Sequence, residues 1–186
     1  MTTADVITGV RVRLRPAVAE DADAFRRILA TPEVSRWWGG DPEQGLAELM
    51  HPDDDTRVYA IELGGVTVGL IQYYEETDPM YRHAGIDISV HPDHHGRGIG
   101  SDAVYALARH LIEERGHHRL VIDPRADNEV AIRTYRKVGF RPVGVMRRYE
   151  RAADGTWRDG LLMDLLADEL TAPTMVDSDR KSPPAR

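Results

Sequence analysis

The stretch "HPDHHGRGIGSDAVYAL", from His91 to Leu107, most constrains what this chain can fold into. Gly96, Gly98 and Gly100 alternate with other residues between an apolar, strand-like run and an amphipathic run that begins at Ile99. A glycine-rich turn between a strand and a helix leaves several backbone N–H groups unpaired at the positive end of the helix dipole. The sequence therefore predicts an α/β fold with an anion site at this turn, and phosphate is the usual anion.

Two phosphate-binding classes fit this turn poorly. A Walker loop ends in Gly-Lys-Ser/Thr, whereas Gly100 is followed by Ser101 and Asp102. A dinucleotide fingerprint has glycine at its first, third and sixth positions, but the sixth position counted from Gly96 is Ser101. That fingerprint also opens a βαβ domain, whereas several predicted strands precede this turn. The pyrophosphate arm of coenzyme A is the third class to consider.

The composition limits the ligand and the location. The chain carries 24 basic and 31 acidic side chains, for a net charge of −7, which disfavours a nucleic acid and favours a cationic partner. The absence of cysteine excludes disulfides, thiolate nucleophiles and zinc–thiolate sites. No apolar run is long enough to span a membrane and no export signal is recognisable. We therefore expect a cytoplasmic protein with no membrane partner.

The hydrophobic periodicity predicts one domain over residues 1–170 and a disordered, polar, proline-rich tail over residues 171–186. Turn and cap residues separate the expected elements: a hairpin turn at Gly64-Gly65, a helix end at Gly116, a helix cap at Asp127 or Asn128, and a turn at Asp154-Gly155. The expected elements are a strand at 10–16, a helix from Glu20 that ends at Pro32, a helix at 42–50, hairpin strands within 56–76, a strand at 84–92, a helix at 99–115, a strand at 118–124, a helix at 127–140 and two strands within 141–166.

The run His95-Gly96-Arg97-Gly98-Ile99-Gly100 resembles the Gln/Arg-x-x-Gly-x-Gly/Ala signature of the GNAT acetyltransferase superfamily, although His95 departs from it at the first position. A second block, "DNEVAIRTYRKVGF", is also similar to that family, and the resemblance covers about residues 10–166. It implies one α/β domain with a mixed, mostly antiparallel sheet flanked by helices, and acetyl-CoA as co-substrate without a metal. The residues that it implies for coenzyme A binding are Ile88, Val90, His95, Gly96, Arg97, Gly98, Ile99, Gly100, Ser101 and Asn128.

The histidines beside this turn give no metal-binding pattern. His91, His94 and His95 lie in "HPDHH", which matches no ligand spacing of a known metal site. We interpret them as solvated or phosphate-facing, and we expect no metal.

Acetyl transfer from a thioester to an amine needs a base for the ammonium proton and an acid for the departing thiolate. Asp87 precedes the glycine turn on the predicted strand and is the candidate base; the alternative is a solvated polar residue on a half-exposed strand. Tyr135 occupies the position to which the resembled family assigns the acid. Its alternative role is to pack its helix against the sheet.

A closer resemblance indicates the class of amine substrate. Five short segments are similar to those of the aminoglycoside 6'-N-acetyltransferases: "VSRWWGG", "ETDP", "GID", "DP" followed by Asn128, and a late "DG". A polycationic, hydroxyl-rich substrate also suits converging carboxylates beside an aromatic wall. Asp123 has an alternative role in capping the turn before Pro124, and the two tryptophans in anchoring a loop. The substrate-binding residues that this resemblance implies are Trp37, Trp38, Tyr74, Asp78, Asp87, Asp123 and Asp159.

Two other functions remain open. The chain could acylate another amine, such as a siderophore-type hydroxylated lysine or a protein amino group, or it could be a non-catalytic acyl-CoA sensor. A sensor needs the glycine turn but neither Asp87 nor Tyr135, so the presence of both favours an enzyme. The expected partner is a cationic small molecule, most plainly an aminoglycoside, and the oligomeric state is not readable from the sequence.

Overall fold

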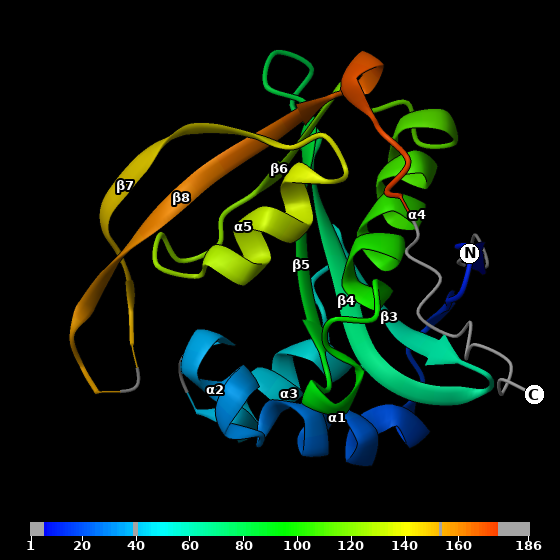
Figure 1. The fold of residues 1–186 in the computed structure, drawn as a ribbon, viewed down its shortest axis with the longest axis vertical. Helices are drawn as coiled ribbons and strands as arrows, with labels where there is room; N and C mark the ends of the chain where they lie inside the picture. The colour runs from blue at the N-terminus through cyan, green and yellow to red at the C-terminus, as the bar shows by residue number, and fades with distance from the viewer. Residues whose placement is uncertain (1–5, 39–40, 153, 175–186) are drawn as a thin grey trace, which may run out of the picture.

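The computed structural model describes residues 6–38, 41–152 and 154–174. Eight strands form one sheet in the order β1-β2-β3-β4-β5-β6-β8-β7, in which β5 and β6 are parallel and the other neighbours antiparallel. This confirms the predicted mixed, mostly antiparallel sheet flanked by helices (Figure 1). The strands are β1 (Ile7–Thr8), β2 (Arg13–Pro16), β3 (Thr56–Leu63), β4 (Val66–Glu76), β5 (His83–Val90), β6 (Arg119–Ile122), β7 (Arg141–Arg151) and β8 (Trp157–Leu166).

Helices pack on both faces of the sheet. The helices are α1 (Ala22–Leu29), α2 (Pro32–Trp38), α3 (Pro42–Met50), α4 (Ile99–Glu113) and α5 (Glu129–Arg136), with 3₁₀ turns at Ala19–Asp21, Pro92–His94 and Ala167–Glu169. Because side chains alternate along β3, Tyr59 and Ile61 join the core beneath α4, whereas Val58 and Ala60 join a second core with α1, α2 and α3. The alternation therefore fixes which helices cover which face.

The parallel pair β5 and β6 positions the site. The two strands pair only at Ala84 with Leu120 and at Gly85 with Val121, and then separate. From Ile86 onward β5 has no strand partner on that side among the described residues, so backbone polar groups of this part of the strand can bind a ligand. In Figure 1, α5 lies beside this opening, next to the long hairpin of β7 and β8.

The turns predicted from glycine are present. Gly64 and Gly65 have φ of 59° and 83° between β3 and β4, as the hairpin requires, and Gly155 has φ of 79° between β7 and β8. Gly116, with φ of 69°, follows the end of α4. Asn128, one of the two predicted caps, accepts a hydrogen bond from Ala131 N at 3.2 Å and starts α5.

The prediction for Pro32 was wrong. It was expected to end the first helix, but α1 already ends at Leu29 and Pro32 is the first residue of α2. A proline at a first helical position loses no hydrogen bond, since that N–H has no partner within the helix. The short strand β1 was also missed, and the predicted strand at 10–16 begins only at Arg13. Most of the predicted tail, 175–186, lies outside the described residues.

A buried carboxylate fixes the N-terminal segment to α4. Asp102, fully buried in the first turns of α4, accepts backbone hydrogen bonds from Val10 at 2.9 Å, Arg11 at 2.7 Å and Val12 at 3.0 Å. Three donors replace the water that the carboxylate loses on burial. The turn between β1 and β2 is thereby attached to the helix that carries the glycine turn. Among the described residues, no helix is long and apolar enough to cross a membrane.

Candidate active site

The glycine turn forms one end of a groove of about 500 Å³. Gly96 and Gly98 have φ of 74° and 77°, in the left-handed region that glycine adopts without strain, and Gly98 is the N-cap of α4. Backbone N–H groups at the start of a 15-residue helix therefore face the groove, which suits a pyrophosphate. The groove runs from this turn along the unpaired end of β5 to α5, so it has the shape and donors that an extended nucleotide thioester needs.

The structure brings most of the predicted coenzyme A residues to this groove. Its walls include Ile88, Val90, His95, Gly96, Gly98, Ile99, Gly100, Ser101 and Asn128. The ring of His95 donates from Nε2 to Val90 O at 2.7 Å, so this side chain ties the turn to β5. Arg97 is not among the lining residues; its carbonyl accepts from Arg11 Nη1 at 3.2 Å.

A second cavity of about 490 Å³ opens on the other side of β5. Trp37, Ile88, Ser89, Asn128 and Tyr135 line both spaces, so the two meet at the splayed strands. A thioester held in the groove would reach an acceptor held in the cavity only at this junction.

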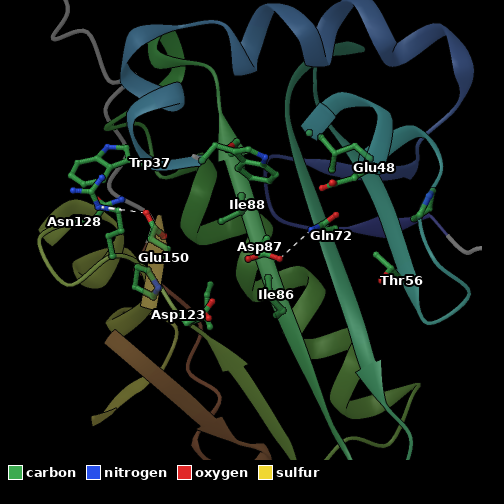
Figure 2. Close-up of a pocket in the computed structure, with 18 of the residues that line it drawn as sticks. Trp37, Glu48, Thr56, Gln72, Ile86, Asp87, Ile88, Asp123, Asn128 and Glu150 are labelled. Atoms are coloured by element: carbon green, nitrogen blue, oxygen red, sulfur yellow. Dashed lines mark hydrogen bonds and ion pairs between the residues drawn. The ribbon is translucent and has the colours of Figure 1, made fainter. Parts of the chain in front are cut away.

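Asp87 projects from β5 into the second cavity (Figure 2). Its Oδ2 accepts a hydrogen bond at 3.1 Å from Nε2 of Gln72, the residue paired with it on β4. Burial raises the pKa of Asp87, the Gln72 hydrogen bond opposes this, and the charge of Asp123 adds to the rise. A raised pKa makes this carboxylate a better proton acceptor than one in water.

Tyr135 lies at the junction of the two spaces and is 8% exposed. Burial raises the pKa of its phenol, and the charges of Asp87 and Asp123 raise it further. The phenol therefore keeps its proton at neutral pH. The ring also packs against Phe140 with centroids 6.3 Å apart, so the predicted packing role is present beside the candidate catalytic one.

Carboxylates from four separate parts of the chain converge on the second cavity. Besides Asp87 they are Glu48 on α3 with Asp53 shortly after it, Asp123 after β6 and Glu150 on β7. Figure 2 shows Glu48 across the space from Asp123 and Glu150. Burial raises the pKa of Glu150, and its Oε1 has no hydrogen-bond partner among the described residues. The nearest cation is Arg125, whose Nε lies 3.7 Å from that oxygen. Such a cavity favours a cation with several charges.

The two tryptophans have different surroundings. Trp37 lies beneath two guanidinium groups, with Arg36 Cζ 4.2 Å and Arg125 Cζ 4.9 Å from its ring centroid. Arg125 is 9% exposed and also donates to Asp127, at 2.8 Å, so it fixes the Trp37 ring at the cavity edge. Trp38 packs against the core of α1 and α3 while lining the same cavity. The expected anchoring role is present, and contact of either ring with a substrate stays a prediction.

Three predicted substrate residues do not line this cavity. Asp78 lies in the loop after β4, where its Oδ1 accepts from Met80 N at 2.8 Å. Asp159 Oδ1 accepts from Arg148 N at 2.7 Å in the β7–β8 hairpin. Tyr74 lines a smaller neighbouring cavity, where its ring lies against Gly85 so closely that any side chain there would overlap it.

Several lining residues were not predicted, among them Gln72, Arg125, Tyr149 and Glu150. Gln72 could have been found only from the register of β4 with β5, in which it lies opposite Asp87. No sequence pattern marks the other three. Arg125 lies between β6 and α5, where it forms an isolated bridge with Gly160, and the last two come from a strand whose register is shifted. The Gly39-Gly40 pair of "WWGG" lies outside the described residues.

No group of three or more potential metal ligands lies close enough together to hold a metal in the part of the chain that the structure describes.

Comparison with known proteins gives a consistent result. Residues 11–141 match the model of the acetyltransferase (GNAT) domain. Spermidine N(1)-acetyltransferase of Escherichia coli strain K12 is 26% identical over 168 residues, covering 87% of this chain and 89% of the relative. Aminoglycoside N(6')-acetyltransferase type 1 of Klebsiella pneumoniae is 30% identical over 156 residues, covering 73% and 76%. The structure of Mycobacterium smegmatis RimJ with CoA-disulfide is similar with a TM-score of 0.79, 28% identity and 89% coverage of each chain.

Proposed function

This chain belongs to the GNAT acetyltransferase family and is an acetyl-CoA-dependent N-acetyltransferase, and from that premise we propose that it acetylates the 6'-amine of an aminoglycoside. The observation that carries the proposal is the convergence of Glu48, Asp87, Asp123 and Glu150 on one cavity with an aromatic edge. A volume of about 490 Å³ lies within the range of sites for drug-sized ligands. A branched polycation can meet carboxylates on opposite walls at once.

Asp87 is proposed as the base. Its charge holds the substrate ammonium, and its raised pKa favours removal of the proton, directly or through a water. The freed amine then has the lone pair that forms the new C–N bond. Gln72 keeps the carboxylate in place by its 3.1 Å hydrogen bond.

Tyr135 is proposed as the acid. Bound acetyl-CoA supplies the acetyl group as a thioester whose C–S bond breaks as the C–N bond forms. Tyr135 donates its phenolic proton to the departing sulfur, so that neutral thiol leaves. The amine loses two protons in all: Asp87 takes the first before the attack, and the second, released by the nitrogen of the new C–N bond, returns to the Tyr135 phenolate. The glycine turn and the start of α4 hold the pyrophosphate, and the unpaired edge of β5 offers backbone hydrogen bonds to the pantetheine arm.

A polyamine is the second candidate acceptor. The spermidine-acetylating relative aligns with more of this chain than the aminoglycoside-acetylating one, 87% against 73%. Converging carboxylates also suit any polycation. A linear polyamine is narrower, however, and would leave much of the cavity to water.

The test measures thiol release from acetyl-CoA with kanamycin, its analogue with a 6'-hydroxyl, spermidine and a lysine-rich peptide. We expect turnover of kanamycin with kcat/KM of about 10⁴ M⁻¹s⁻¹ or more, and none with the 6'-hydroxyl analogue. Turnover of spermidine alone would transfer the proposal to polyamines. Turnover of the peptide alone would contradict both candidates.

A further inference from the structure

A smaller cavity of about 180 Å³ adjoins the acceptor cavity. The two share Ile86, Asp123 and Tyr149, which therefore form the boundary between them. Beyond this boundary the smaller cavity is lined by Tyr74, His83 and Arg119, whose guanidinium is paired with Asp164 at 3.0 Å. The remaining lining side chains are apolar: Val121 of β6, Met146 of β7 and Leu162 of β8. Its volume corresponds to about six water molecules at liquid density, enough for one ring or a short aminoalkyl arm.

Tyr149 reaches this boundary because β7 is bulged. Met146 pairs with Gly160 and Glu150 with Arg158, so three residues of β7 lie opposite the single residue Asp159 of β8. Arg148, in the middle of the bulge, has φ of 51°, which is rare outside glycine. Its N–H donates to Asp159 Oδ1 at 2.7 Å. The carboxylate of Asp159 thus holds the strained residue that precedes Tyr149.

The absence of a side chain at Gly160 leaves room for the Tyr149 ring. A Cβ atom at Gly160 would lie 2.9 Å from Cδ1 of Tyr149, closer than real Cβ contacts, so the ring can lie there only over a glycine. From this position the Tyr149 hydroxyl hydrogen-bonds Asp123. The Asp159-Gly160 pair therefore positions Tyr149, and Tyr149 in turn orients the carboxylate between the two cavities.

We propose that the small cavity binds the distal cationic arm of the acceptor, that Tyr149 is the residue that determines this specificity, and that Asp159 and Gly160 are positioning residues for it. The inference rests on the proposed polycationic acceptor. With the reacting amine beside Asp87, the next ammonium group of the acceptor meets Asp123 at the boundary. The remainder of the arm then packs against the rings of Tyr149 and Tyr74.

The experiment compares a long and a short acceptor that carry the same reacting amine: kanamycin with neamine, which lacks the third ring, and spermidine with putrescine. For the wild-type enzyme kcat/KM is expected to be higher for the long member. In Gly160→Ala this preference should fall by about tenfold through KM of the long acceptor, with kcat and the KM for acetyl-CoA unchanged. Gly144→Ala is the matched control, because nothing lies within 4 Å of a Cβ added to this glycine of the same hairpin.

Asp159 provides a test by rescue. Asp159→Ala should lose the preference, whereas Asp159→Asn keeps an oxygen for Arg148 N–H and should retain it. If Asp159 instead bound the substrate ammonium through its charge, the Asn variant would lose the preference as well, and the positioning role would be refuted. An unchanged preference in Gly160→Ala and Tyr149→Phe would overturn the small cavity as a subsite.

A readout independent of turnover separates this inference from the proposed function. In enzyme labelled with 3-fluorotyrosine, the ¹⁹F resonance assigned by Tyr149→Phe should move when kanamycin or spermidine is added. Absence of kanamycin turnover by the wild type would by itself refute the aminoglycoside proposal. A Tyr149 resonance that none of the four amines moves would refute the inference.

Discussion

The hydrogen bond from Gln72 to Asp87 makes a quantitative prediction about the pH dependence of catalysis. Asp87 acts as a base only when ionised, so kcat/KM must fall as the pH drops through its pKa. Burial raises this pKa and the 3.1 Å bond from Gln72 lowers it. Gln72→Leu removes this hydrogen bond and puts an apolar side chain of similar length in its place on β4.

The size of the shift follows from the energy of the bond. A hydrogen bond to a charged group contributes about 1.5–3 kcal/mol, and one pKa unit corresponds to about 1.4 kcal/mol. Because water in the cavity can partly replace the lost donor, we use the lower end of this range. The acid limb of the kcat/KM profile should therefore move upward by about one pH unit, with activity on the alkaline plateau retained.

The assay is thiol release from acetyl-CoA across the pH range, with Asp87→Asn as reference. That variant should lower kcat/KM by about 10²–10⁴-fold and abolish the limb. It should also be more stable than the wild type at neutral pH, because burial penalises the ionised carboxylate; this gain should vanish below the ordinary Asp pKa of 3.8. An unmoved limb in Gln72→Leu, or near-normal activity in Asp87→Asn, would refute Asp87 as the base.

Three further predictions follow from individual residues. Tyr135→Phe should lower kcat by about 10²-fold or more without changing the KM for acetyl-CoA, because it removes the proton donor and keeps the ring; an unchanged kcat would leave Tyr135 only its packing role. Gly98 and Gly116 have φ of 77° and 69°, so replacing either with alanine should lower the unfolding free energy by about 1 kcal/mol. Only Gly98→Ala should also weaken acetyl-CoA binding in a calorimetric titration. Asp102→Asn should lower the unfolding free energy by about 2 kcal/mol in urea titration, since the new amide would turn N–H groups toward the backbone donors of Val10, Arg11 and Val12. Equal stability would show that these three hydrogen bonds contribute little.

Features that depend on local backbone geometry could be predicted from the sequence. Gly96 and Gly98 need positive φ whatever surrounds them, and the strand and helix on either side follow from periodicity, so the anion-binding turn was identifiable. Asp87 follows in the same way, since it lies a few residues before that turn on a strand with clear alternation. The Gly64-Gly65 hairpin fixes only the pairing of β3 with β4, in which Gln72 lies opposite Val58.

Features that depend on register or on long-range packing could not be predicted. The bulge in β7 adds residues opposite Asp159, and this reassigns every later side chain of the strand. Tyr149 and Glu150 therefore reach the cavity at positions that a regular alternation gives no reason to choose. Asp159 was expected to bind an ammonium group by resemblance, whereas its carboxylate accepts from Arg148 N–H, a contact visible only once the two strands are aligned.

The interaction between Asp87 and Asp123 gives a last prediction about the bound state. In the free enzyme the charge of Asp123 contributes to the raised pKa of Asp87. An acceptor ammonium beside Asp123 neutralises that charge, so the pKa of Asp87 falls when a polycation binds. The acid limb of kcat, which reports the complex, should then lie at lower pH than the limb of kcat/KM, which reports the free enzyme. With a monoamine acceptor, which places no second ammonium beside Asp123, the two limbs should nearly coincide. A separation of equal size for both acceptors would show that Asp123 does not meet the second ammonium, and the preference for a polycation would then need another source.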